Sequence, residues 1–112
     1  MIKTLIVIAD KKPYSIMVGG DKKLGYGKIR KLLRYKKVRL AKRNEVKEIT
    51  GFDIGEVCPL SYVLERIPRI MDKGIVKKDV VLTGGGSQYT LVKIKVKELL
   101  RTLAPIVADF SK

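Results

Sequence analysis

Residues 1–18, MIKTLIVIADKKPYSIMV, hold the pattern that most strongly indicates the fold. Two β-rich segments, residues 3–9 and 14–18, are joined around Lys11-Lys12-Pro13, which is typical of a hairpin or tight turn. Lys3 stands at the head of the first segment. A lysine there either extends its ammonium into water from a stem on apolar surface, or is a cation at the mouth of a site. This stretch alone leaves both readings open.

Strand and helix patterns alternate along the rest of the chain. Ile29, Leu32 and Leu33 share one face of a helix predicted over residues 26–35. A second helix is predicted from Asn44, as a possible cap, through Ile49, ending at Gly51. The remaining pattern predicts strands over 38–41, 66–71, 79–82, 89–95 and 106–110, a helix over 96–103, and a shaped loop over 51–61. We therefore expect one mixed α/β domain over residues 1–112, with a central mixed sheet, partly barrel-like, flanked by helices.

The composition narrows the chemistry. The 112 residues include no histidine, which excludes Ser-His-Asp, Cys-His and histidine-ligated metal sites. Cys58 is the only cysteine, and such a residue is more often a small core side chain than a nucleophile. We expect no metal and no cofactor. Because no apolar run reaches the length of about 18 residues typical of a membrane span, we also expect a cytoplasmic protein with no membrane partner. The scarcity of amides hints at a thermophilic source.

The charge is strongly positive and uneven. Twenty-five basic residues against eleven acidic ones give +14, and residues 22–43 hold eleven Lys or Arg without one acid. A solvated helix face is the ordinary explanation of a short basic run. A run of this length favours a polyanion, because each neutralised phosphate releases a counterion. The predicted nucleic-acid-binding residues are Lys22, Lys23, Lys28, Arg30, Lys31, Arg34, Lys36 and Lys37.

Two glycine-rich stretches fail the tests for nucleotide-binding motifs. In GGDKKLGYGK, residues 19–28, Lys28 is followed by Ile29 rather than by Ser or Thr, so it is no P-loop. A strand pattern follows Thr83-Gly84-Gly85-Gly86, whereas a dinucleotide fingerprint opens a helix. The second stretch is a tight connection whose backbone can still line an anion or carbonyl site.

Several short motifs occur in a recognisable order. Lys3-Thr4-Leu5 opens a strand, Gly55-Glu56-Val57-Cys58-Pro59 lies in the shaped loop, and Asp72 follows an apolar strand. An apolar strand then leads into Gly84-Gly85, and KELL at residues 97–100 begins the last helix. From Lys3 to about Phe110 the chain resembles the YbaK/prolyl-tRNA-synthetase-associated domain family, which deacylates mischarged transfer RNA.

The resemblance implies a site and a reaction. Lys3 matches the family's functional lysine and is the implied catalytic residue. The implied substrate-binding residues are Thr4, Gly55, Glu56, Val57, Cys58, Pro59, Thr83, Gly84 and Gly85. The implied partner is mischarged tRNA rather than DNA, and the implied mechanism is substrate-assisted attack by water on the aminoacyl ester.

One departure from the family shapes a second hypothesis. Family members usually carry some dozens of residues before this lysine, as helices that close the pocket, and this sequence has two. We therefore expect that a synthetase or a second chain completes the pocket. The alternative is a non-catalytic tRNA- or RNA-binding or synthetase-associated module that has lost part of the pocket.

Overall fold

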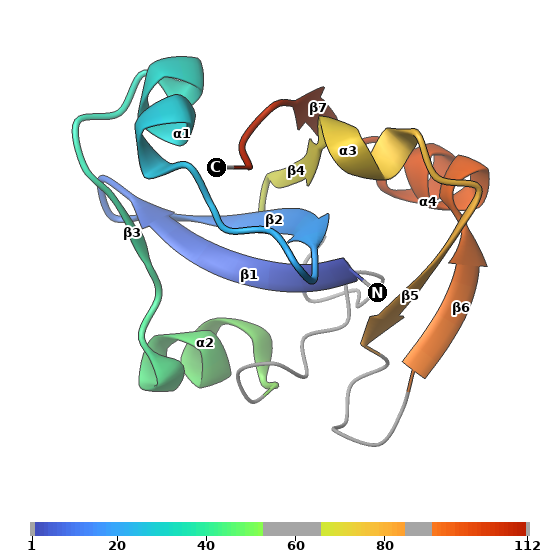
Figure 1. Cartoon of the computed structure of the whole chain (residues 1–112). Coiled ribbons are helices and arrows are strands. Elements are labelled where there is room, and N and C mark those ends of the chain that lie inside the picture. Colours follow the sequence, from blue (N-terminus) through green and yellow to red (C-terminus); the bar gives the residue numbers. More distant parts are fainter. Residues whose placement is uncertain (1, 53–65, 85–90, 112) are drawn as a thin grey trace.

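The computed structural model describes residues 2–52, 66–84 and 91–111. The strands within these ranges are β1 (Ile2–Ala9), β2 (Lys12–Gly19), β3 (Val38–Leu40), β4 (Arg69–Asp72), β5 (Val80–Gly84), β6 (Leu91–Lys95) and β7 (Ile106–Ala108). The helices are α1 (Tyr26–Leu33), α2 (Arg43–Thr50), α3 (Lys73–Val76) and α4 (Val96–Leu103). The predicted alternation of strands and helices is thus confirmed (Figure 1).

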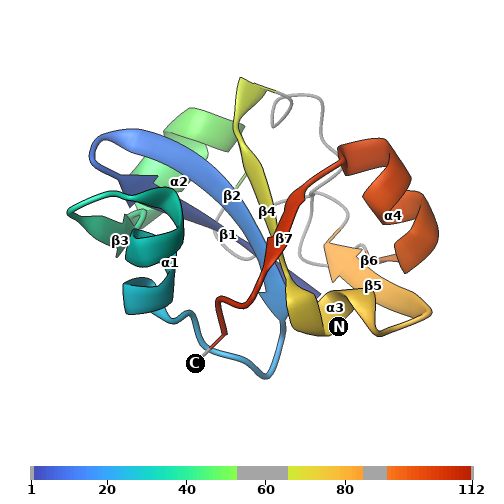
Figure 2. The ribbon, with the colours of Figure 1, turned by 90° about the horizontal axis from the view of Figure 1, so that it is seen from above.

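The strands form two sheets. Five of them lie in the order β3-β1-β2-β4-β7, with antiparallel pairing between β1 and both β2 and β3. The pairs β2–β4 and β4–β7 are parallel, so the central sheet is mixed, as predicted. The antiparallel pair β5–β6 forms a separate sheet beside the start of β1 (Figures 1 and 2). The described strands do not close into a barrel, because β3 and β7 are the two edges of the larger sheet.

The hairpin between β1 and β2 turns at Asp10 and Lys11, one residue earlier than the sequence predicts. Both residues have positive φ, 46° and 77°, as the central pair of a type I′ hairpin turn does. Ala9 and Lys12 close the pairing, so Lys12 already belongs to β2.

The core is divided by the alternation of side chains along β1. Val7 and Ala9 pack in a cluster with Ile29 of α1, whereas Ile6 and Ile8 pack with Val46 of α2. Figure 1 shows the same division, with α1 above the hairpin and α2 below it. A third cluster joins the start of β1 and the end of β2 to α3, α4 and β5.

Two details of the helices differ from the sequence prediction. Ile29 is fully buried and Leu33 partly so, but Leu32 is 43% exposed and lies outside the core. The helix α2 begins after Lys42, whose backbone N–H donates to the Glu45 carboxylate at 2.8 Å, and Asn44 is exposed inside the first turn. Its end at Gly51 is confirmed, since Gly51 has a φ of 79° at the C-cap.

Candidate functional site

Lys3 and Thr4 are neighbours in a regular stretch of β1. Lys3 pairs with Val18 of β2 and Thr4 with Met17. Lys3 is half-buried and shares its face of the strand with Leu5 and Val7, on the side that carries α1. Thr4 is buried and shares the opposite face with Ile6 and Ile8. The two predicted site residues therefore leave the strand in opposite directions.

Thr4 and Thr83 each bury a hydroxyl that has no hydrogen-bond partner among the described residues. Thr4 is 7% exposed and Thr83 is fully buried, and within residues 2–52, 66–84 and 91–111 neither Oγ1 atom has a donor or an acceptor in reach. The strands that carry them, β1 and β5, pack against each other. An unpaired buried hydroxyl costs about 1–3 kcal/mol, so such groups are rare unless a ligand or water uses them. Both residues were selected from sequence as substrate-binding, and their unsatisfied hydroxyls fit that hypothesis.

Among the remaining predicted pocket residues, only Gly84 belongs to the described part of the chain. Gly84 is the last residue of β5 and pairs with Leu91. The loop residues Gly55, Glu56, Val57, Cys58 and Pro59, together with Gly85, lie outside the described residues. The predicted approach of Lys3 to that loop therefore stays a prediction.

The predicted nucleic-acid-binding residues gather around α1. Lys22 and Lys23 precede the helix, Arg34 is its left-handed C-cap, and Lys36 and Lys37 follow it, all exposed. Arg30 and Lys31 lie exposed on the helix itself. Lys28 differs from them, because its ammonium contacts the Asp109 carboxylate at 3.3 Å and donates to the Ser111 carbonyl at 2.8 Å. Much of its charge is thus used within the fold.

The segment that follows α1 is fixed to the hairpin. The Tyr35 and Tyr14 hydroxyls are 2.7 Å apart, and their rings meet edge to face with centroids 5.7 Å apart. Burial, and then the hydrogen bond with Tyr35, raises the pKa of Tyr14 to about 12. The Asp10 carboxylate accepts backbone N–H groups of Lys36 and Lys37, at 3.2 and 2.9 Å. The backbone of the two lysines is therefore held in place.

Sequence reasoning missed Lys11 and Arg39, which lie beside this segment. Arg39 pairs with Ile8 across β1 and β3, and its guanidinium makes two hydrogen bonds to Glu45, at 2.7 and 2.9 Å. The hydrogen bond from Arg39 and that from the Lys42 backbone lower the pKa of Glu45 to about 2. The hydrogen bond to Glu45 likewise raises the pKa of Arg39. Only the pairing of β3 with β1 brings Arg39 next to the hairpin. The basic run in the sequence therefore could not predict that Arg39 and Lys11 lie together.

The described ranges also bear on a metal site and on a membrane span. In residues 2–52, 66–84 and 91–111, no three acidic or cysteine side chains gather as a metal site requires. Within the same part of the chain, every helix is too short or too polar to span a bilayer.

Comparison with known proteins identifies the family. The model of the aminoacyl-tRNA editing domain matches residues 1–102. The chain therefore belongs to the aminoacyl-tRNA editing domain family, as its motif order predicted.

Individual relatives agree with this assignment. A proline–tRNA ligase of Endomicrobium trichonymphae is 35% identical over 112 residues, which are 99% of this chain and 19% of the ligase. A ligase of the same name from Oleidesulfovibrio alaskensis is 36% identical over 67 residues, or 60% of this chain and 12% of that protein. The chain thus spans less than a fifth of the length of these curated relatives.

Solved structures match along nearly the whole chain. The crystal structure of a hypothetical protein superimposes with a TM-score of 0.92 at 33% identity, covering 100% of this chain and 74% of its own. A candidate trans-editing enzyme for prolyl-tRNA synthetase gives a TM-score of 0.90 at 32% identity, covering 99% and 69%. The fold is therefore that of YbaK-like editing proteins.

Proposed function

We propose that this chain hydrolyses the ester bond of a mischarged aminoacyl-tRNA. The observation that carries the proposal is the pair of unpartnered buried hydroxyls, Thr4 and Thr83, on two packed strands of an editing-domain fold. The family resemblance implies that both residues bind substrate, with Thr83 on the pocket wall. The names of the relatives make tRNA specific for proline the first substrate to examine.

The proposed roles follow from what each side chain offers. Each threonine hydroxyl is both a donor and an acceptor, and is suited to orient the ester or a water molecule. Lys3 supplies a point charge for a phosphate or for the negative charge that develops on the ester oxygen. Because Lys3 and Thr4 lie on opposite faces of β1, the proposal requires the substrate to contact both faces near the start of the strand, where these are the second and third residues.

No protein general base is assigned in this proposal. The chain has no histidine, and a hydroxyl of the terminal adenosine is proposed to help activate the attacking water. The basic residues around α1 would hold the RNA through its phosphates. This division leaves the protein with binding, orientation and charge stabilisation, which are sufficient for large rate effects.

The direct test is release of free amino acid from proline-specific tRNA charged with a panel of noncognate amino acids. We expect turnover of at least one substrate by the parent chain. Lys3→Ala should lower the rate at least about a hundredfold, the cost of one preorganised charge contact. It should change the free energy of unfolding by less than about 0.5 kcal/mol, as surface substitutions usually do.

Lys97→Ala is the matched control, because Lys97 is exposed on α4 and its replacement also removes one positive charge. Equal rates for Lys3→Ala and Lys97→Ala would remove Lys3 from the mechanism. Tight binding of tRNA without release of any amino acid would support the alternative, a non-catalytic RNA-binding module.

A further inference from the structure

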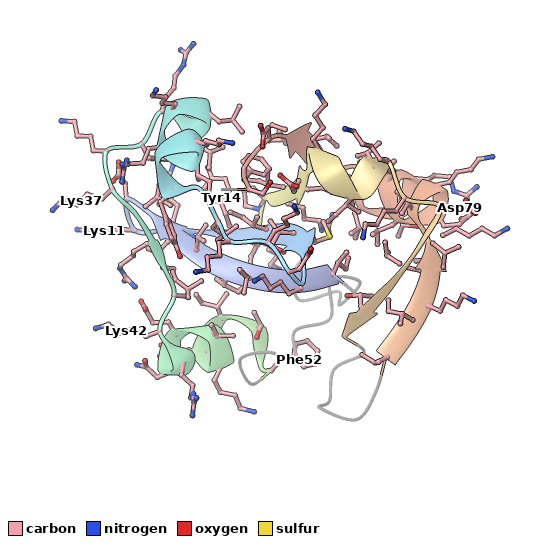
Figure 3. The ribbon with its side chains drawn as sticks, in the orientation of Figure 1. Lys11, Tyr14, Lys37, Lys42, Phe52 and Asp79 are labelled. Carbon is pink, nitrogen blue, oxygen red and sulfur yellow. The ribbon has the colours of Figure 1, made fainter. Side chains whose placement is uncertain are left out.

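A groove of about 530 Å³ lies at the hairpin end of the molecule, away from the predicted catalytic lysine. The described residues that line it are Ile8, Asp10, Lys11, Lys37 and Arg39. They come from β1, the hairpin turn, the segment after α1, and β3. Figure 3 shows Lys11 and Lys37 projecting at this same end. The volume falls in the range of small-molecule sites, about 300–1,000 Å³, and is larger than a lone phosphate needs.

The groove has an apolar floor and a cationic rim. Ile8 is 9% exposed, and the stems of the surrounding long side chains add further apolar wall. Three cations and one carboxylate line the groove, and one of the cations, Arg39, is already paired with Glu45. Among the described lining residues, the two lysines therefore supply its free positive charge. That carboxylate, of Asp10, already accepts two backbone N–H groups, so its negative charge is partly offset. This combination suits a ligand with an apolar flat part and an attached anion.

The backbone around the groove is preorganised. The hairpin turn fixes the backbone of Lys11, and the Asp10 N–H donates to the Lys37 carbonyl at 3.0 Å. The two hydrogen bonds from Arg39 to Glu45 fix the plane of its guanidinium. Unpaired RNA bases stack on arginine planes of this kind. Little ordering therefore remains to be done when a ligand binds.

From these features we propose that the groove binds one unpaired nucleotide of RNA, with its base against Arg39 and Ile8 and its phosphate between Lys11 and Lys37. The proposal rests on the proposed function for the identity of the RNA. Thr4 and Ile8 share one face of β1 and are four residues apart, which corresponds to about 13 Å. Stacked nucleotides rise about 3.4 Å each, so this is about four nucleotides. Ile6 lies between them on that face and is buried against α2, so the RNA would pass around it, and the groove would hold a nucleotide at least about that far from the aminoacylated end.

The test measures equilibrium binding of uncharged, labelled 3′-end tRNA oligonucleotides of two to eight nucleotides. We expect the affinity of the parent to rise at a length of about four. The double variant Lys11→Ala/Lys37→Ala should lose this rise, with affinity for the longer oligonucleotides reduced at least about tenfold. Its dependence of log affinity on log salt should flatten by about 0.7, since the one phosphate that the two lysines hold on a single strand contributes about that much.

The control is Lys77→Ala/Lys97→Ala, which removes the same charge from exposed positions at the end of α3 and on α4. A second arm replaces the fourth nucleotide from the 3′ end by an abasic one. This replacement should lower the affinity of the parent at least about fivefold, the lower limit of the contribution of base stacking. The same replacement should change the affinity of the Arg39→Lys variant very little, because that variant has already lost the stacking surface.

Equal losses in the two double variants would overturn the proposal, since the effect would then be general electrostatics. No rise of affinity with length would overturn it as well. So would competition by free AMP at the affinity of the longer strand, which would indicate a site for free nucleotides. The binding assay uses uncharged RNA, so its result can be interpreted even if the chain has no hydrolytic activity. The proposed function is tested independently, by the release of free amino acid.

Discussion

Replacing Asp72 by alanine should destabilise the fold by about 2–5 kcal/mol. Asp72 ends β4, is only 3% exposed, and caps α3. Its Oδ1 accepts the N–H groups of Phe110 at 2.9 Å and Ser111 at 3.1 Å, and its Oδ2 accepts that of Gly74 at 3.2 Å. One carboxylate thus holds both the start of α3 and the segment that follows β7.

The magnitude follows from what the three donors can do after the substitution. The bond to the Phe110 N–H is buried, and an orphaned buried donor costs about 1–3 kcal/mol. The N–H groups of Gly74 and Ser111 are only part-buried and regain water, so each loses about 0.5–1 kcal/mol. For a domain of this size, about 1 kcal/mol moves the melting temperature by about 4 °C. The expected decrease in melting temperature is about 8–20 °C.

Thermal unfolding followed by circular dichroism, with urea unfolding as a second measure, tests this. Asp72→Asn keeps one carbonyl oxygen and should lose only about 1–2 kcal/mol. Asp79→Ala is the matched control, because Asp79 is an exposed aspartate just before β5. If Asp72→Ala unfolds within about 1 kcal/mol of the parent, the carboxylate does not hold these segments together, and the reasoning is wrong.

Two further predictions concern pH. Glu45 has a folded pKa of about 2, below its ordinary value of 4.5, so its contribution to stability is present above pH 4.5 and is lost as the pH falls from there toward 2. Glu45→Gln should be less stable than the parent at pH 7, and urea unfolding across this range should show the difference shrinking toward pH 2. Tyr14 has a folded pKa of about 12, above its ordinary value of 10, so its contribution is complete below pH 10 and is lost as the pH rises from 10 to 12. Tyr14→Phe should cost about 1 kcal/mol at pH 7, and its ultraviolet titration should lack the tyrosine that ionises near pH 12; an unchanged titration would contradict the assignment.

Much of the fold could be predicted from local patterns. The alternation of Val92 and Ile94 with lysines marks β6, and α4 spans Val96–Leu103 as predicted. Errors arose where tertiary contacts decide. Leu32 fits the apolar face of α1 by spacing, yet the sheet covers only Ile29 and part of Leu33. Asn44 is a good capping residue by type, but the hydrogen bonds from Arg39 and Lys42 to Glu45 place the start of α2 two residues earlier.

The candidate site was predictable to a different degree. Thr4 and Thr83 came from motif order, and their unpaired hydroxyls are visible only in the packed structure. The opposite directions of Lys3 and Thr4 follow from strand alternation, which sequence could have supplied once β1 was accepted. The groove at the hairpin required the pairing of Ile8 with Arg39, a contact between residues far apart in the chain. Composition carries no information about such register.

The return of the last segment to the start of α1 has a consequence for synthesis. The Gly25 N–H donates to the Phe110 carbonyl, Leu24 bridges to Ser111, and Phe110 is fully buried in the cluster beneath α1. These contacts join positions more than 80 residues apart, so they close a very long loop and form late. While the ribosome still holds residues near 110, the hairpin can pair but its core cannot be sealed. A nascent chain therefore exposes the apolar surface beneath α1 until Phe110 has left the ribosome, and it is open to aggregation during that interval.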